Sequence, residues 1–76
     1  MPHIDIKCYP KHLSESEMNT FVAELTELAG KHLKSTEEYI SISYTEIPAE
    51  QWKEEVFDKD IRPNIGKLAK DPGYDM

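Results

Sequence analysis

The sequence predicts a small α/β fold, in which a βαβ unit is followed by a C-terminal helical segment. Two blocks in which apolar and polar residues alternate lie on either side of one block with helical periodicity. A strand, a helix and a strand of these lengths are typical of two parallel strands joined by a crossover helix. The chain has 76 residues, which is enough for one domain and no more, so we expect residues 1–76 to form a single domain.

The first block, residues 3–9, predicts a half-buried strand. Successive side chains point to opposite faces of a strand. Here one face carries Ile4, Ile6 and Cys8, and the other carries His3, Asp5 and Lys7. Pro10 follows shortly afterwards, and because proline has no backbone N–H to donate, we expect it to end the strand.

The second block predicts a helix that begins after Ser14. Ser14 and Glu17 have the spacing of a capping box, in which each side chain accepts a hydrogen bond from the other residue's backbone N–H. Apolar residues then recur at helical spacing; they are Met18, Phe21, Val22, Leu25, Leu28 and Ala29. Lys31 and Lys34 lie near the expected end of the helix, where positive charge suits the helix dipole.

The third block, residues 39–45, alternates again and is rich in β-branched and aromatic residues, which predicts a second strand. After Pro48 the apolar residues indicate a helical segment; they are Trp52, Val56, Phe57, Ile61, Ile65 and Leu68. Pro63 is expected to bend or divide this segment, because a proline cannot donate within a helix.

A chain this short needs reinforcement, since it buries only about 60% of the surface that its unfolded form exposes. Cys8 is the only cysteine, so no disulfide can form, and the three histidines show no zinc-site spacing. A parallel sheet also needs cover on both faces. We therefore expect association with copies of the same chain, which would complete the sheet across the interface.

The net charge of the chain limits the classes of partner that it is expected to bind. Fifteen acidic residues against nine basic ones give a net charge of −6, which disfavours nucleic acid and anionic membranes as partners. No apolar stretch approaches the roughly 18 residues that a membrane-spanning helix needs. The first residues lack the basic and apolar regions of a signal peptide. These features favour a soluble cytoplasmic protein.

Two stretches and the ending of the chain together point to a family. Pro2-His3-Ile4-Asp5-Ile6 opens the first strand, and Ile40-Ser41-Ile42-Ser43-Tyr44-Thr45-Glu46-Ile47 forms the second. With the capped helix between them, they resemble the 4-oxalocrotonate tautomerase family over essentially the whole chain. The ending, Lys70-Asp71-Pro72-Gly73-Tyr74-Asp75-Met76, looks like that of the PptA-like subgroup.

The resemblance implies a tautomerase-like fold and an isomerase that acts without cofactor or metal. It further implies keto–enol tautomerisation of a small 2-oxo acid such as phenylenolpyruvate. The PptA-like ending suggests a homodimer, although the family also builds hexamers.

Pro2 is the candidate general base. Removal of Met1 would leave a secondary amine at Pro2, and α-amino groups titrate near pH 7.7 to 8.0. Strand alternation puts Pro2 on the face of Ile4 and Ile6, and apolar surroundings disfavour the cation, so the amine can be neutral at working pH. The resemblance assigns the same role to this proline. On its own, a proline at position two also fits a residue that merely permits methionine removal or opens a strand.

The resemblance also indicates residues that bind the substrate. Two arginines of the family bind and polarise an anionic substrate, and they align with the Lys11-His12 region and with Ser41. Lysine lacks the bidentate fork of arginine, and serine carries no charge, so a monoacid is a better candidate than a dicarboxylate. The aromatic residue of the family's active site aligns with Trp52, which would pack on the apolar part of the substrate.

Two alternatives remain open at this point. One is a hydratase-like reaction, in which protonated Pro2 acts as an acid. The other is a dimeric binding module without enzymatic activity.

Overall fold

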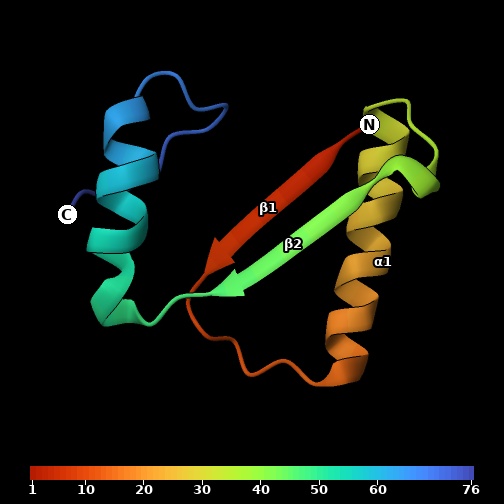
Figure 1. Cartoon of the computed structure of the whole chain (residues 1–76), viewed down its shortest axis with the longest axis horizontal. Coiled ribbons are helices and arrows are strands. Elements are labelled where there is room, and N and C mark those ends of the chain that lie inside the picture. The colour runs from red at the N-terminus through yellow and green to blue at the C-terminus, as the bar shows by residue number, and fades with distance from the viewer.

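The computed structural model describes residues 1–76 and contains one parallel two-stranded sheet, one long helix and a C-terminal arm (Figure 1). Strand β1 spans His3–Cys8 and strand β2 spans Ser41–Glu46, with helix α1, Glu15–His32, between them in the chain. The register pairs His3 with Ser41 and continues to Cys8 with Glu46. The predicted βαβ order and the parallel strands are therefore confirmed.

The capping box that the sequence predicts forms at the start of α1. The Ser14 hydroxyl accepts from the Glu17 backbone N–H at 3.1 Å, and the Glu17 carboxylate accepts from the Ser14 N–H at 3.0 Å. The hydrogen bond from the Ser14 N–H lowers the pKa of Glu17, because it stabilises the charged carboxylate. Leu33 caps the other end, where its N–H donates to the Ala29 carbonyl at 2.8 Å.

Strand β2 begins two residues later than the alternation predicts. The segment Glu37–Tyr39 forms a single 3₁₀ turn, closed by hydrogen bonds from Tyr39 N–H to Thr36 O and from Ile40 N–H to Glu37 O. These bonds are local and use the backbone groups that a strand would offer to its neighbour, so pairing with β1 starts only at the end of the turn.

The C-terminal arm comprises residues 49–64. It starts with a turn, Ala49–Gln51, continues through the wide π-type helix Lys53–Ile61, and ends with the 3₁₀ turn Arg62–Asn64. The helical segment after Pro48 and its division near Pro63 are thus confirmed. The expectation of helical structure as far as Leu68 is wrong: beyond Asn64 the chain forms turns, and Gly66 has a φ of 87° that a helix does not allow.

Helix α1 covers one face of the sheet, and the opposite face is open. The Phe21 ring of α1 meets the Tyr44 ring of β2 edge-on, with centroids 6.4 Å apart. Tyr44 is paired with Ile6 in the register, so both lie on the helix side. The open face is polar; it carries His3, Asp5, Lys7, Ser41, Ser43 and Thr45.

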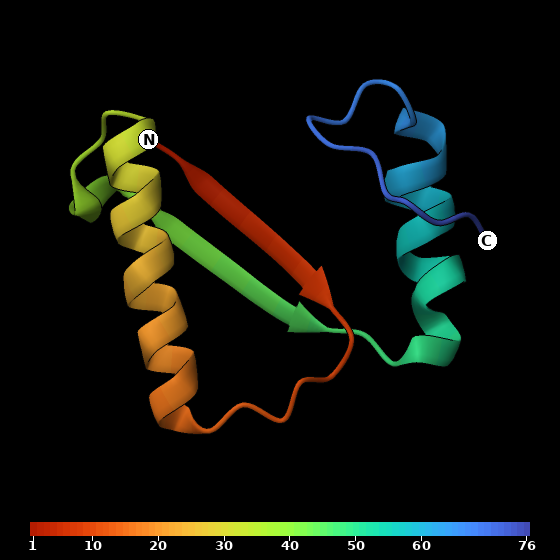
Figure 2. The ribbon, with the colours of Figure 1, turned by 180° about the vertical axis from the view of Figure 1, so that it is seen from behind.

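The arm stands apart from helix α1, on the other side of the sheet in both views (Figures 1 and 2). Only four of 76 residues are buried, namely Ala29, Ile47, Val56 and Phe57. The radius of gyration is 14.3 Å, whereas a compact chain of this length has about 11 Å. A single copy of the chain is thus an open structure with little core of its own. None of its helices combines the length and apolar character needed to cross a membrane.

Candidate active site

Pro2 lies immediately before β1 and continues the sheet by one residue. Its carbonyl oxygen accepts a hydrogen bond of 3.2 Å from the Ser41 backbone N–H. Pro2 is half-buried like Ile4 and Ile6, whereas the residues between them are exposed, as the predicted alternation requires. The ring is therefore held at the start of the sheet, on the side that faces α1.

Ser41 is at the same end of the sheet as Pro2, but its side chain is on the open face. The Ser41 hydroxyl and the His3 Nδ1 are 2.7 Å apart and share a hydrogen bond. Sequence reasoning did not select His3 as a site residue. The feature that could have pointed to His3 is its position, directly after Pro2 and across from Ser41 in a parallel register.

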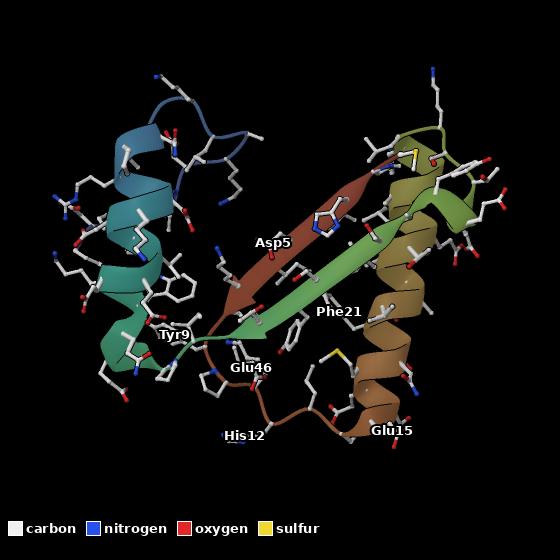
Figure 3. All side chains as sticks on the ribbon, in the orientation of Figure 1. Asp5, Tyr9, His12, Glu15, Phe21 and Glu46 are labelled. Atoms are coloured by element: carbon white, nitrogen blue, oxygen red, sulfur yellow. The ribbon has the colours of Figure 1, made fainter.

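Lys11 and His12 lie at the opposite end of the sheet, in the loop after β1, where Figure 3 shows Tyr9, His12 and Glu46 together. The Glu46 carboxylate accepts from the Lys11 backbone N–H at 3.1 Å and from the Tyr44 hydroxyl at 2.9 Å. Glu46 therefore ties the loop to the end of β2. His12 follows with a φ of 55°, a left-handed conformation that non-glycine residues seldom adopt.

The hydrogen bonds of this cluster shift two pKa values. The hydrogen bond from the Lys11 backbone, followed by that from Tyr44, lowers the pKa of Glu46, because both stabilise its charged form. The neighbouring Cys8 thiol, partial burial and the Glu46 carboxylate raise the pKa of Tyr44, so this phenol keeps its proton. Sequence reasoning did not identify Glu46 as the residue that positions the Lys11-His12 loop.

Trp52 is half-buried beside the end of β1. Its ring meets the Tyr9 ring edge-on, with centroids 5.2 Å apart, and its indole N–H donates to the Tyr74 hydroxyl at 2.9 Å. A pocket of about 380 Å³ opens here; it is lined by Lys7, Cys8, Tyr9, Trp52, Tyr74 and Met76. Pockets for small ligands commonly measure 300–1,000 Å³.

The only arginine, Arg62, is occupied elsewhere. Its guanidinium lies 3.4 Å from the Asp58 carboxylate, donates to the Met76 carbonyl and stacks 5.0 Å from the centroid of the Phe57 ring. The ion pairs of the structure involve Lys7, Lys53 and Arg62, which leaves the Lys11 ammonium available to an anion. No group of three or more metal-ligating side chains gathers anywhere in the chain.

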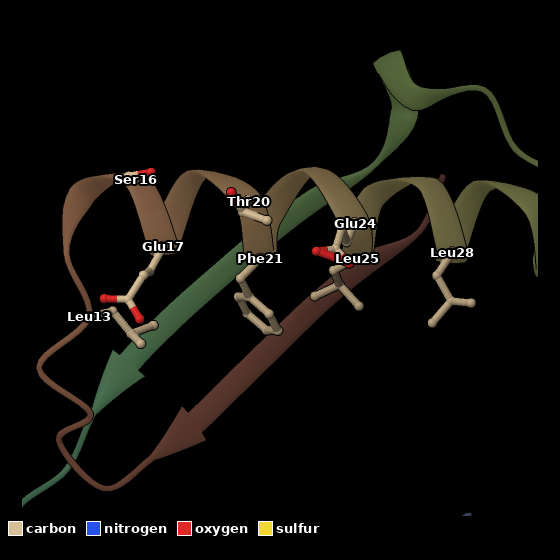
Figure 4. A pocket seen from close by; sticks show the side chains of 8 residues that line it. All are labelled: Leu13, Ser16, Glu17, Thr20, Phe21, Glu24, Leu25 and Leu28. Carbon is tan, nitrogen blue, oxygen red and sulfur yellow. The ribbon is translucent and has the colours of Figure 1, made fainter.

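A larger groove of about 700 Å³ runs along α1 (Figure 4). Its apolar lining consists of Leu13, Phe21, Leu25 and Leu28, and its polar edge of Ser16, Glu17, Thr20 and Glu24. Leu28 is 56% exposed. The groove contains no candidate base or cation, so its size does not make it the reaction site.

The candidate residues thus form two groups at opposite ends of β1. Pro2 and Ser41 are at the start of the strands, and Lys11, His12 and Trp52 are beyond their ends. Six strand residues at about 3.3 Å each separate the groups by about 20 Å. A small acid cannot touch both groups of the same copy.

Comparison with known proteins gives relatives that match 97% to 100% of the chain. Tautomerase PptA of Cronobacter sakazakii is 45% identical over 76 residues, which is 100% of both chains. Tautomerase PptA of Pectobacterium carotovorum is 42% identical over 74 residues and 97% of each chain, and that of Escherichia coli is 42% identical over 76 residues and 100% of each. No family model matches the chain.

Proposed function

The chain belongs to the PptA-like tautomerases, which are isomerases, and from this premise we propose that it interconverts the keto and enol forms of a small 2-oxo acid. Phenylenolpyruvate is the substrate type that we propose, and the general base is the amine of Pro2 after removal of Met1. The observation that carries the proposal is the position of Pro2, half-buried at the start of β1 and fixed by the Ser41 N–H.

The chemistry of the base follows from its surroundings. With Met1 attached, the Pro2 nitrogen is an amide and has no basicity. Once Met1 is removed, the nitrogen becomes a secondary amine on the apolar side of the sheet, where the neutral form is favoured. The amine takes the hydroxyl proton of the enol as the carbonyl forms, and the resulting prolinium delivers a proton to the adjacent carbon. The amine is neutral again at the end of the cycle.

The remaining site residues reach Pro2 only if a second copy supplies them. We propose a homodimer in which the free edges of two β1 strands pair antiparallel about a twofold axis. Such pairing brings the start of one β1 beside the end of the other. Pro2 of one copy then faces the loop that carries Lys11 and His12, and the pocket at Trp52, of the partner copy.

Three properties of the single chain support this assembly. Only four residues are buried in one copy, the edge of β1 is unpaired in a sheet of two strands, and the apolar groove along α1 is open. A second copy would cover both the strand edge and the leucines of the groove. The open sheet face is polar and lacks the apolar surface that would need a further partner, which favours a dimer over a hexamer. In this respect the sheet departs from the cover on both faces that parallel sheets usually need.

The substrate-binding roles follow from charge and position. Lys11 and His12 hold the carboxylate of the substrate, since the Lys11 ammonium forms no ion pair within the chain. Ser41 contributes a hydroxyl at the same end of the sheet as Pro2, on the open face and in combination with His3. Trp52 packs on the apolar part. One lysine and one imidazole suit a single carboxylate better than two.

Ketonisation of phenylenolpyruvate between pH 5 and 9 tests the proposal, with mature protein and protein that retains Met1. We expect activity in the mature protein to fall as the pH decreases, because a base must be unprotonated. The Met1-retaining protein should be nearly inactive while keeping the same assembly. Activity that instead falls as the pH rises would indicate an acid role for Pro2, and equal activity of both proteins would remove Pro2 from the mechanism.

A further inference from the structure

The last twelve residues, 65–76, form a tail that folds back onto the arm. Within the tail, the Asp71 carboxylate accepts from the Gly66 N–H at 3.1 Å. Arg62 of the arm donates to the carbonyl of Met76. The Tyr74 ring packs against Phe57, with centroids 5.7 Å apart, and Phe57 is the most deeply buried side chain of the protein. The tail is therefore attached to the arm at several points.

Tyr74 connects this tail to Trp52. The Trp52 indole N–H donates to the Tyr74 hydroxyl at 2.9 Å, while Tyr9 contacts the indole ring from the β1 side. A tryptophan whose N–H and ring both have partners is restricted in its rotamers. The orientation of Trp52 is thus set from two directions, by the end of β1 and by the tail.

The pocket beside Trp52 is suited to a ring rather than to a second acidic group. Aromatic side chains from the residue after β1, from the arm and from the tail form its walls: Tyr9, Trp52 and Tyr74. The one charged lining residue, Lys7, is already neutralised by Asp60 at 3.1 Å and Asp5 at 3.8 Å. The pocket consequently offers no free positive charge to a carboxylate.

We propose that Tyr74 is a positioning residue that fixes the Trp52 indole, and that the tail thereby completes a subsite for the aromatic ring of the substrate. The inference rests on the proposed function, in which Trp52 packs on the apolar part of a 2-oxo acid. It adds a specificity determinant: the tail makes the enzyme prefer aryl 2-oxo acids over alkyl ones, without taking part in proton transfer.

Tyr74→Phe tests the inference, because it removes the hydroxyl and retains the ring that packs on Phe57. Tyr39→Phe is the matched control, since Tyr39 is 52% exposed in the turn before β2. Exchange of the C3 protons of phenylpyruvate and of 2-oxobutanoate into deuterated water, followed by NMR, gives kcat and KM for an aryl and an alkyl substrate.

For Tyr74→Phe we expect KM for phenylpyruvate to rise by about 2- to 10-fold, the usual effect of one lost hydrogen bond. The kcat for phenylpyruvate and the KM for 2-oxobutanoate should stay within about twofold of wild type, as should all constants of Tyr39→Phe. Equal changes in KM for the two substrates, or a change in kcat alone, would overturn the role of Tyr74.

Binding without catalysis separates this inference from the proposed reaction. Trp52 is the only tryptophan, so its fluorescence reports directly on the pocket. 3-Phenylpropanoate, which cannot enolise, should quench it more weakly in Tyr74→Phe than in wild type. A protein in which Tyr74→Phe weakens this quenching but which has no exchange activity would overturn the reaction and keep Tyr74. An active protein whose Tyr74→Phe variant binds like wild type would overturn Tyr74 and keep the reaction.

Discussion

The Ser41 backbone N–H donates a 3.2 Å hydrogen bond to the carbonyl oxygen of Pro2, and this bond joins the residue before β1 to the first residue of β2. Because the bond uses backbone groups, it survives substitution of the Ser41 side chain. The position of Pro2 can therefore be tested separately from the charge of the side chain at position 41.

Ser41→Arg should shift substrate preference toward dicarboxylate enols, because it adds a positive charge at the end of the sheet where Pro2 lies. We expect the ratio of kcat/KM for a dicarboxylate enol to that for phenylenolpyruvate to rise about fivefold, the effect of about 1 kcal/mol from an exposed charge pair. Ser43→Arg, one register step away on the same face, is the control and should leave the ratio unchanged. The same ratio in all three proteins would contradict the placement of Ser41 at the site.

Glu46 should make the protein's stability depend on pH through its lowered pKa. The folded-state pKa lies below the ordinary value of 4.5, so the stabilisation by the charged form is complete above about pH 4.5 and is lost as the pH falls through the folded value. Between pH 7 and 3, Glu46→Gln should lose less unfolding free energy in urea than wild type does.

Glu38→Gln, in the exposed turn before β2, is the control for Glu46 and should follow wild type across the same pH range. If Glu46→Gln also follows wild type, the carboxylate does not contribute to holding the Lys11 loop.

Ser14→Ala should lower the free energy of unfolding by about 1 kcal/mol, the usual cost of a lost N-cap. The Glu17 N–H then loses its acceptor at the start of α1. Ser16→Ala makes the same chemical change two residues later, within the helix and without a capping role, and should be neutral. Chemical denaturation of both variants at pH 7 measures the difference. Similar losses for the two would mean that the capping box does not stabilise α1.

The local elements could be predicted from the sequence because each is encoded by neighbouring residues. The capping box fixed the start of α1, and the alternation of Ile4 and Ile6 with polar residues fixed β1. The start of β2 was misplaced by two residues, since the turn over Glu37–Tyr39 depends on backbone hydrogen bonds that alternation does not reveal.

The site was less predictable than the fold, because its contacts join residues that are far apart along the chain. The Trp52–Tyr74 hydrogen bond spans 22 residues and the Lys11–Glu46 bond spans 35; no periodicity encodes such contacts. Residue types alone also do not reveal that Pro2 and Trp52 lie at opposite ends of β1. This separation follows from the parallel register, and it leads directly to the strongest test of the dimer.

Two inactive variants should restore activity when mixed, if each site combines Pro2 of one copy with the Lys11 loop and Trp52 of the other. One variant is Pro2→Ala without Met1, and the other carries Lys11→Ala together with Trp52→Ala. A mixed dimer then contains one intact site, with Pro2 from the second variant and with Lys11 and Trp52 from the first. Random exchange of subunits makes half of the dimers mixed, so about a quarter of the wild-type kcat/KM should return.

Sedimentation should show a dimer for each variant and for the mixture at micromolar concentration. Leu28→Asp should weaken this dimer, because it puts charge into the apolar groove of α1, whereas Ala23→Asp, at an exposed position outside the groove, should not. The mixing experiment has a clear contrary outcome. If every site lay within one copy, the mixed dimer of the Pro2 variant and the Lys11/Trp52 variant would carry one defect in each site, and no activity would return. A mixture that exchanges subunits yet stays inactive therefore rules out the shared site, and a stable monomer rules out the assembly itself.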